Sequence, residues 1–214
     1  MTIAPQDDGT ARDAAALSLA VPVPTLRSST ATDVALVATF AAFIAVCALL
    51  PGVTLPGMVV PITLQTFGVM LAGLVLGPRR GALAVLLYLA VGLAGLPVFS
   101  GGTGGLAVLG KPSVGYLLAF PLAAALAGYL MTRLRRARPS TLPVMAFLAA
   151  TAGSLLVIHP IGIAAMGARL GLSAQEAITA GSVFLPGDVI KNVFAAIVAA
   201  AVFRAFPDLL TRRR

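Results

Sequence analysis

The sequence predicts an all-α integral membrane protein, a single compact bundle of six transmembrane helices with both termini in the cytoplasm. Composition is the first observation: 59% of the 214 residues are hydrophobic and 10% are charged, whereas a soluble domain carries roughly 25% charged residues. Second, the apolar stretches are long and do not alternate with polar residues, which favours helices over the strands of a barrel. Third, the basic residues gather on one side of the predicted bundle.

The domain boundaries follow from the same pattern. Residues 1–30 are polar, with no short apolar core and cleavage site of a signal peptide, and are expected to form a disordered cytoplasmic tail. Residues 31–208 form the six-helix membrane domain, and residues 209–214 form a basic cytoplasmic tail. The single cysteine, Cys47, lies in an apolar run and is interpreted as a small buried hydrophobe; it indicates neither a metal nor a redox site.

The first predicted span covers residues 33–50, and one of its faces carries small side chains at three- and four-residue spacing. Such spacing lets another helix approach closely. Two interpretations remain open, namely packing within the bundle and docking of a partner subunit. The face consists of Ala31, Ala35, Ala38, Ala42 and Ala45.

Two Pro-Gly pairs then interrupt the helix, and residues 51–61 form an apolar loop that suits a lid over a binding cavity. The second span is predicted at residues 59–76. Polar side chains near its start hydrogen-bond either to other helices or to a ligand; they are Thr63, Gln65 and Thr66.

A tight basic turn at residues 77–81 leads into the third span, residues 81–97, which ends in a glycine-rich loop at residues 98–105. Glycine permits close backbone approach to a ligand. The loop lacks the lysine and Ser/Thr that end a P-loop, so nucleotide binding is not expected there.

Three further spans are predicted at residues 113–131, 142–167 and 185–206. His159 precedes a proline within the fifth span, and it is either a proton carrier or a partner in a hydrogen bond, at the kink or between helices. The connection before the sixth span contains Ser173 and Glu176 at the spacing of a capping box.

Six spans place both termini on one side of the membrane, and all but three of the 15 Lys and Arg residues fall on that side. The positive-inside rule then assigns this side to the cytoplasm. These basic residues sit in short loops between spans, so nucleic acid is not an expected partner. The three exceptions are Lys111, Arg169 and Lys191.

The sixth span opens with an unusual set of polar residues, because Asp188, Lys191 and Asn192 project from nearly the same helix face. Ionisable residues within a membrane are costly and are functional-site candidates. Lys191 lies about 9 Å into the span at 1.5 Å per residue, in the outer third of the bilayer. An alternative interpretation makes Asp188 a simple helix-start acid that Lys191 neutralises.

Four stretches of the chain resemble the BioY family, the biotin-specific substrate-binding (S) components of energy-coupling-factor (ECF) transporters. They are Pro61–Thr66 followed by Leu76–Gly81, Gly95–Gly105, Gly115–Phe120, and Pro186–Asp188 with Lys191. The resemblance implies high-affinity biotin binding near the outer surface of a bacterial cell membrane, with Asp188, Lys191 and the glycine-rich loop (Gly102, Thr103) in the site. Phe99 and Tyr116 are expected to pack on the ligand's rings. Lys111 departs from the family's usual sequence and either contacts the ligand carboxylate or faces solvent.

The resemblance implies a transport function that needs partners. The chain has no nucleotide site of its own, so uphill transport requires ATPase subunits and a transmembrane coupling subunit, in addition to biotin and membrane lipid. An alternative is a proton-coupled secondary transporter of a small vitamin-like anion, in which His159 or Asp188 titrates. No nucleophile–base pair or metal-ligand cluster is visible, so no enzyme activity, metal or cofactor is predicted.

Overall fold

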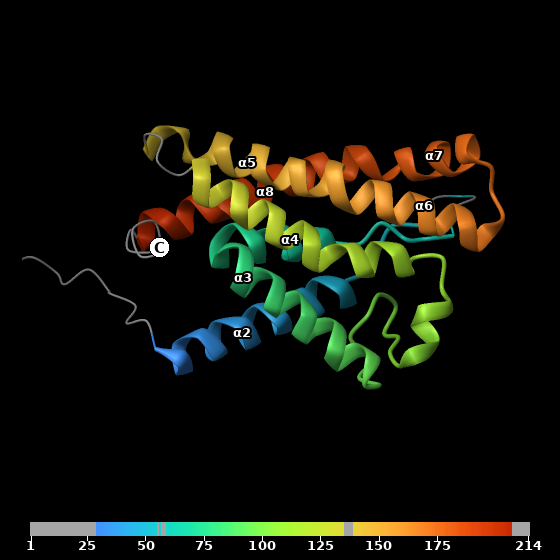
Figure 1. Ribbon diagram of the computed structural model, residues 1–214, viewed down its shortest axis with the longest axis horizontal. Helices are drawn as coiled ribbons and strands as arrows, with labels where there is room; N and C mark the ends of the chain where they lie inside the picture. The colour runs from blue at the N-terminus through green and yellow to red at the C-terminus, as the bar shows by residue number, and fades with distance from the viewer. Residues whose placement is uncertain (1–28, 55, 57–58, 135–138, 207–214) are drawn as a thin grey trace, which may run out of the picture.

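The computed structural model describes residues 29–54, 56, 59–134 and 139–206, and over these residues it is all-helical (Figure 1). The predicted tails at residues 1–30 and 209–214 lie outside this range, apart from residues 29 and 30. Five apolar segments are long enough to cross a membrane: α2 (Thr30–Leu49), α3 (Gln65–Leu93), α4 (Val114–Leu134), the continuous α5–η3–α6 (Leu142–Leu170) and α8 (Phe184–Ala205). Shorter helices are η1 (Leu106–Gly110), η2 (Pro139–Thr141) and α7 (Ala174–Ser182).

Helix α3 reverses direction in its middle. Gly77 has non-helical dihedrals (φ 80°, ψ −178°), and Pro78 follows it within the same element. A Cβ added to Gly81 would lie 2.8 Å from the Cα of Gly73, whereas residues eight apart in a straight helix are separated by about 12 Å. The element therefore consists of two arms, residues 65–76 and 78–93, that fold back on each other (Figure 1). The predicted basic turn coincides with this bend.

Two predicted helix boundaries are wrong. The second span was expected to begin at Val59, but the helix begins at Gln65, because Ile62 instead forms an antiparallel bridge with Val53 (N···O 2.8 and 2.9 Å). The third span was expected to extend to Pro97, but the helix ends at Leu93, since Gly95 adopts a φ of 114° that helix does not allow.

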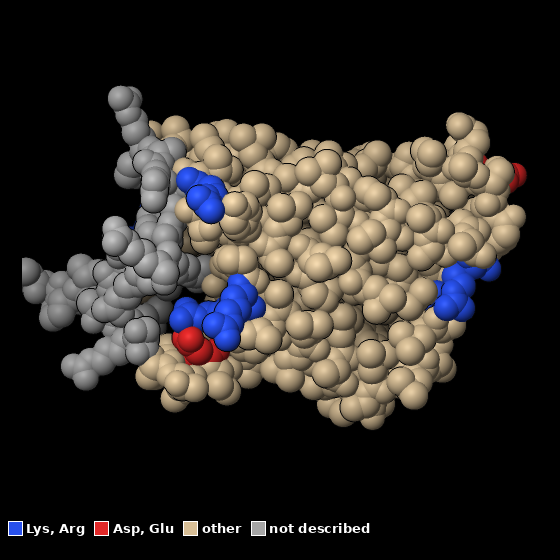
Figure 2. Space-filling view, in the orientation of Figure 1, with Lys and Arg blue, Asp and Glu red and all other residues tan. Residues whose placement is uncertain are grey.

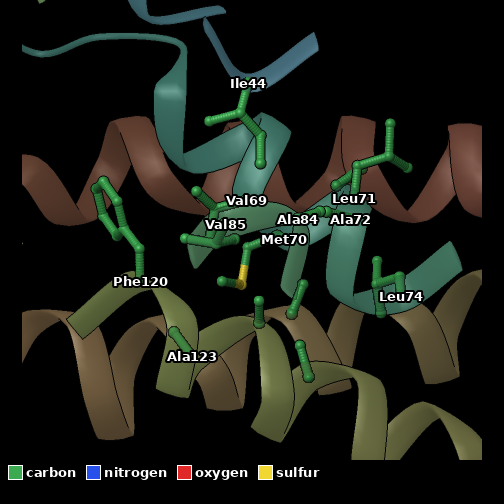
Figure 3. Close-up of a cluster of buried hydrophobic side chains, with 14 of the residues drawn as sticks. Ile44, Val69, Met70, Leu71, Ala72, Leu74, Ala84, Val85, Phe120 and Ala123 are labelled. Atoms are coloured by element: carbon green, nitrogen blue, oxygen red, sulfur yellow. The ribbon is translucent and has the colours of Figure 1, made fainter. Parts of the chain in front are cut away.

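Close packing of α3 against α4 forms the centre of the molecule. Gly73 lies directly on the backbone of Ala124, and Gly128 lies on the backbone of Gly77 at the bend. Small residues let membrane helices approach to this distance. The buried cluster beside this contact surrounds Met70, with side chains from both arms of α3 and from its neighbours α2 and α4 (Figure 3).

Charged side chains lie toward the two ends of the molecule, and the band between them is free of them on the face in Figure 2. Arg79 and Arg80 follow the bend in α3, and Arg133 lies in the last turn of α4. The bend and this end of α4 lie at the end of the bundle where α2 begins (Figure 1). Arg80 forms an ion pair with Asp33 of α2 (2.7 Å). The uncharged band between the two ends is expected of a protein surrounded by lipid, because charged side chains are costly in the bilayer interior.

The alanine face of α2 is largely uncovered. The opposite side of α2 packs on α3 through Ile44, Cys47 and Ala48, which are buried. The interpretation that the alanine face packs within the bundle is therefore wrong for most of its length. Its exposed members are Ala31, Ala35, Ala38 and Ala42, while Ala45 is half-buried.

The predicted capping box is present at the start of α7. The backbone N–H of Ser173 donates to the Glu176 carboxylate (2.8 Å), and the Ser173 hydroxyl accepts from the Glu176 backbone N–H (3.4 Å). Hydrogen bonds from the Ser173 hydroxyl and N–H also lower the pKa of the Glu176 carboxyl. The capping box therefore sets the residue at which α7 begins, within the connection that leads to α8.

The contact between α3 and α4 yields a stability prediction. Gly128→Ala should lower the free energy of unfolding by about 1–3 kcal/mol, because the added methyl group would collide with backbone at Gly77 and Pro78. Gly110→Ala is the matched control, since no atom lies within 4 Å of its added Cβ. Thermal unfolding in detergent measures both, and equal melting temperatures for the two variants would contradict this packing.

Candidate ligand-binding site

A cavity of about 390 Å³ lies among the ends of α3, α4 and α8 and two irregular segments. The described residues of the first segment (51–54, 56 and 59–64) and those of the second (94–113) lie at one end of the molecule, opposite the bend in α3 (Figure 1). Both predicted loops contribute to the wall. The lining is mostly apolar, with a few polar groups, which is typical of a small-molecule site. It includes Val59–Thr63, Gln65, Thr66, Phe99–Gly101, Thr103, Val108, Lys111–Ser113, Tyr116, Leu117, Phe120, Phe184, Asp188 and Lys191.

Asp188, Lys191 and Thr66 form a closed cluster of hydrogen bonds in the cavity wall. Oδ1 of Asp188 accepts from the Thr66 hydroxyl (2.9 Å) and from the Lys191 ammonium (2.8 Å), and the same ammonium donates to the Thr66 oxygen (3.1 Å). Asp188 is 6% exposed and is the fifth residue of α8, whose first turn contains no acid. The interpretation of Asp188 as a helix-start acid is therefore wrong, whereas its neutralisation by Lys191 is confirmed.

His159 approaches the other oxygen of Asp188. Its Nε2 lies 3.1 Å from Oδ2, although neither ring nitrogen makes a well-formed hydrogen bond within the described residues. The side chain is 4% exposed and does not line the cavity. A π-turn at Ser154–Ile158 precedes His159, whose backbone N–H donates to the Ser154 carbonyl five residues back. The next residue is Pro160, which has no backbone N–H to donate. His159 thus supports Asp188 from outside the cavity.

Gln65 ties the glycine-rich loop to α3. Its side-chain amide donates to the Tyr88 hydroxyl (2.8 Å), which in turn donates to the carbonyl of Val98 (3.2 Å). The Tyr88 ring packs edge-on against Phe99, with centroids 5.3 Å apart. These contacts fix the ring of Phe99 in the cavity wall. Sequence reasoning missed Tyr88; the available signal is a phenol in an apolar helix, whose hydroxyl needs a partner when buried.

Tyr116 and Phe184 form an aromatic wall. Their rings pack edge-on with centroids 5.6 Å apart, and the Tyr116 ring also rests on Gly162. The Tyr116 hydroxyl is buried and has no hydrogen-bond partner within the described residues. Tyr116 therefore lines the cavity, while its hydroxyl lies out of reach of solvent.

Six of the eight residues predicted for the site line the cavity, and two do not. Asn192 is 2% exposed on α8 and is absent from the lining, while Gly102 adopts a φ of 66° in the turn beside the lining residues Ser100 and Gly101. The lining members are Asp188, Lys191, Gln65, Phe99, Thr103 and Tyr116.

The fold and the cavity together define a class of protein: a multi-span membrane protein with a cavity of small-molecule size near one end of its helices. The chain belongs to the BioY family, whose model matches residues 20–208. It is 44% identical to the biotin transporter BioY of Rhizobium etli over 182 residues, covering 84% of this chain and 97% of the relative. Identity to the biotin transporter BioY of Rhodobacter capsulatus is 39% over 192 residues, covering 85% and 98%.

A solved structure agrees with this assignment. The crystal structure of the S-component for biotin from an ECF-type ABC transporter matches with a TM-score of 0.73 and 28% identity, covering 83% of this chain and 95% of that chain. The predicted family is confirmed. The family is one of transport proteins, which agrees with the prediction that the chain is not an enzyme.

The hydrogen-bonded cluster yields a second prediction. Thr66→Val keeps the side-chain shape but removes a donor to Asp188 and an acceptor for Lys191. The free energy of unfolding should fall by about 1–3 kcal/mol, because buried partners are left unsatisfied. Thr132→Val is the control, since its hydroxyl donates to the carbonyl of Tyr129 in its own helix at an exposed hydrogen bond. Chemical unfolding in detergent measures both variants. Equal losses in the free energy of unfolding would contradict the stabilising role of the cluster.

Proposed function

We propose that this chain binds biotin and takes it up across the cytoplasmic membrane as the substrate-specific subunit of an ECF-type transporter. One observation carries the proposal: the Asp188–Lys191–Thr66 cluster lies in the wall of a largely apolar cavity of about 390 Å³. The relatives named as biotin transporters and the solved biotin S-component support the choice of ligand.

The chemistry of biotin suits this cavity. Biotin has an apolar bicycle and aliphatic tail, which the aromatic and aliphatic walls accommodate, together with a polar ureido group and a carboxylate. Asp188 accepts hydrogen bonds and Lys191 donates them. Phe99 and Tyr116 pack on the rings. Asn192 and Gly102 contribute indirectly, through the α8 core and the shape of the glycine-rich turn.

The two arms of α3 count as separate spans in this proposal, which gives six crossings and places both termini in the cytoplasm of a bacterial cell. Each arm is short, about 18 and 24 Å at 1.5 Å per residue, so the adjoining loops complete the crossing. In the sequence, all but three of the 15 Lys and Arg residues belong to segments that this arrangement assigns to the side of the α3 bend, which supports the orientation. The cavity then opens to the outside.

Energy for uptake comes from other subunits in this proposal. The glycine-rich loop lacks the P-loop signature, so ATPase subunits and a transmembrane coupling subunit are required. The exposed alanine face of α2 is the docking surface proposed for the coupling subunit, because small residues allow close helix approach. A proton-coupled transporter acting alone, the alternative suggested by His159 beside Asp188, would not need such a surface.

The binding site is tested by Asp188→Asn and Lys191→Ala. Each variant leaves its buried partner without a counter-charge, and biotin affinity should fall at least about 100-fold, equivalent to roughly 2.7 kcal/mol. Calorimetry with detergent-purified protein measures the affinity, and size-exclusion chromatography checks that the variants fold. Asp33→Asn is the matched control, since this acid pairs with Arg80 outside the cavity. Unchanged affinity in both site variants would exclude this site.

The docking surface is tested by Ala38→Trp. The indole would protrude from the exposed face of α2 and block a closely approaching helix, so uptake of labelled biotin by cells with all subunits should fall at least about 10-fold while binding by the purified chain stays unchanged. Val144→Trp, at an exposed position of α5, is the control. Full uptake by Ala38→Trp would favour a transporter that works alone.

A further inference from the structure

The charges lining the cavity do not cancel. Three charged side chains line it among the described residues: Asp188, Lys191 and Lys111. The Asp188 and Lys191 side chains are 8% and 12% exposed and form an ion pair of 2.8 Å, so they neutralise each other. Lys111 is left as a surplus positive charge in a small, largely apolar space. Such a cavity suits a ligand that carries one negative charge.

Lys111 is held in place, but its donors are largely unused. Its ammonium donates to the Thr103 hydroxyl oxygen (3.1 Å), and that hydroxyl donates to the Ser100 carbonyl (3.1 Å). Arg169 of α6 donates to the carbonyl of Leu109 (2.9 Å), which anchors the segment just before Lys111. An ammonium has three N–H donors, and the described residues offer Lys111 a single hydrogen-bond acceptor and no carboxylate partner.

The two polar clusters of the cavity lining differ in what they accept. One consists of Asp188, Lys191 and Thr66, and the other of Lys111 and Thr103. A carboxylate placed at Lys191 would also face Asp188, and like charges at short distance repel strongly. A ureido group meets no such conflict, because one of its N–H groups can donate to the Asp188 carboxylate while its oxygen accepts from Lys191. The Asp188 cluster therefore suits a neutral group with an adjacent donor and acceptor, and the Lys111 cluster suits an anion.

We infer that Lys111 binds the carboxylate of the ligand and so determines both its orientation and the selection of the free acid over neutral derivatives. The inference rests on the proposed function and deepens it. Biotin lies with its ureido group at Asp188 and Lys191 and its carboxylate at Lys111 and Thr103. A derivative with an uncharged tail then loses the contact at Lys111 and keeps all the others.

The test compares biotin with biotin methyl ester, which lacks the negative charge, by calorimetry on the full purified chain. The unmodified chain should bind the acid roughly 10- to 100-fold more tightly than the ester, the effect of one charge-assisted hydrogen bond. Lys111→Gln should weaken binding of the acid by that factor and leave the ester's affinity unchanged. Lys111→Arg should retain the preference, and Arg204→Gln controls for loss of one positive charge remote from the cavity.

Two results would overturn the assignment of Lys111 alone: acid affinity that Lys111→Gln leaves unchanged, or equal losses for acid and ester in that variant. Absence of biotin binding by the unmodified chain would instead overturn the proposed function, and this inference with it. The ester also reports on folding, since a Lys111→Gln protein that binds the ester normally has an intact cavity.

Discussion

The ion pair between Asp188 and Lys191 is the interaction on which the site depends. Removing two charges from water is costly, and a buried pair is retained only when hydrogen bonds satisfy it. Here Thr66 bonds to both partners and His159 lies against the remaining oxygen, so residues from α3, α6 and α8 converge on one carboxylate. The result is a fixed polar surface in an otherwise apolar wall, which a ligand with matching polarity can meet without rearranging it.

The close glycine contacts between α3 and α4 position the first arm of α3, which carries Thr66. The first arm of α3 begins at Gln65, and its far end folds back at Gly77 against Gly128 of α4. With the bend seated on α4, the start of the arm reaches the cavity, where Gln65 holds Tyr88 and the loop carrying Phe99. The ring of Phe99 and the hydroxyl of Thr66 are therefore both held by the first arm of α3, whose opposite end is packed on α4.

The sequence was sufficient to predict the helical fold and six residues of the cavity lining, because these leave local signals: apolar length, turn chemistry, or charge within a span. The family was predicted from the resemblance of four stretches of the chain. Other features depend on contacts between distant segments. The late start of α3 follows from the pairing of Ile62 with Val53, and the role of Tyr88 follows from its distance to Gln65. Asn192 shares a helix face with Asp188 in sequence, yet it lies in the core, because helical spacing does not show where the cavity ends.

The two polar clusters of the cavity lining have distinct chemistries, so the position and orientation of the ligand test both proposed roles at once. The most direct measurement is a structure of the full chain with biotin bound. We expect ligand density in the cavity of about 390 Å³, with the ureido group within hydrogen-bonding distance of Asp188 and the carboxylate beside Lys111. Biotin bound outside this cavity, or with its carboxylate against Lys191, would contradict it.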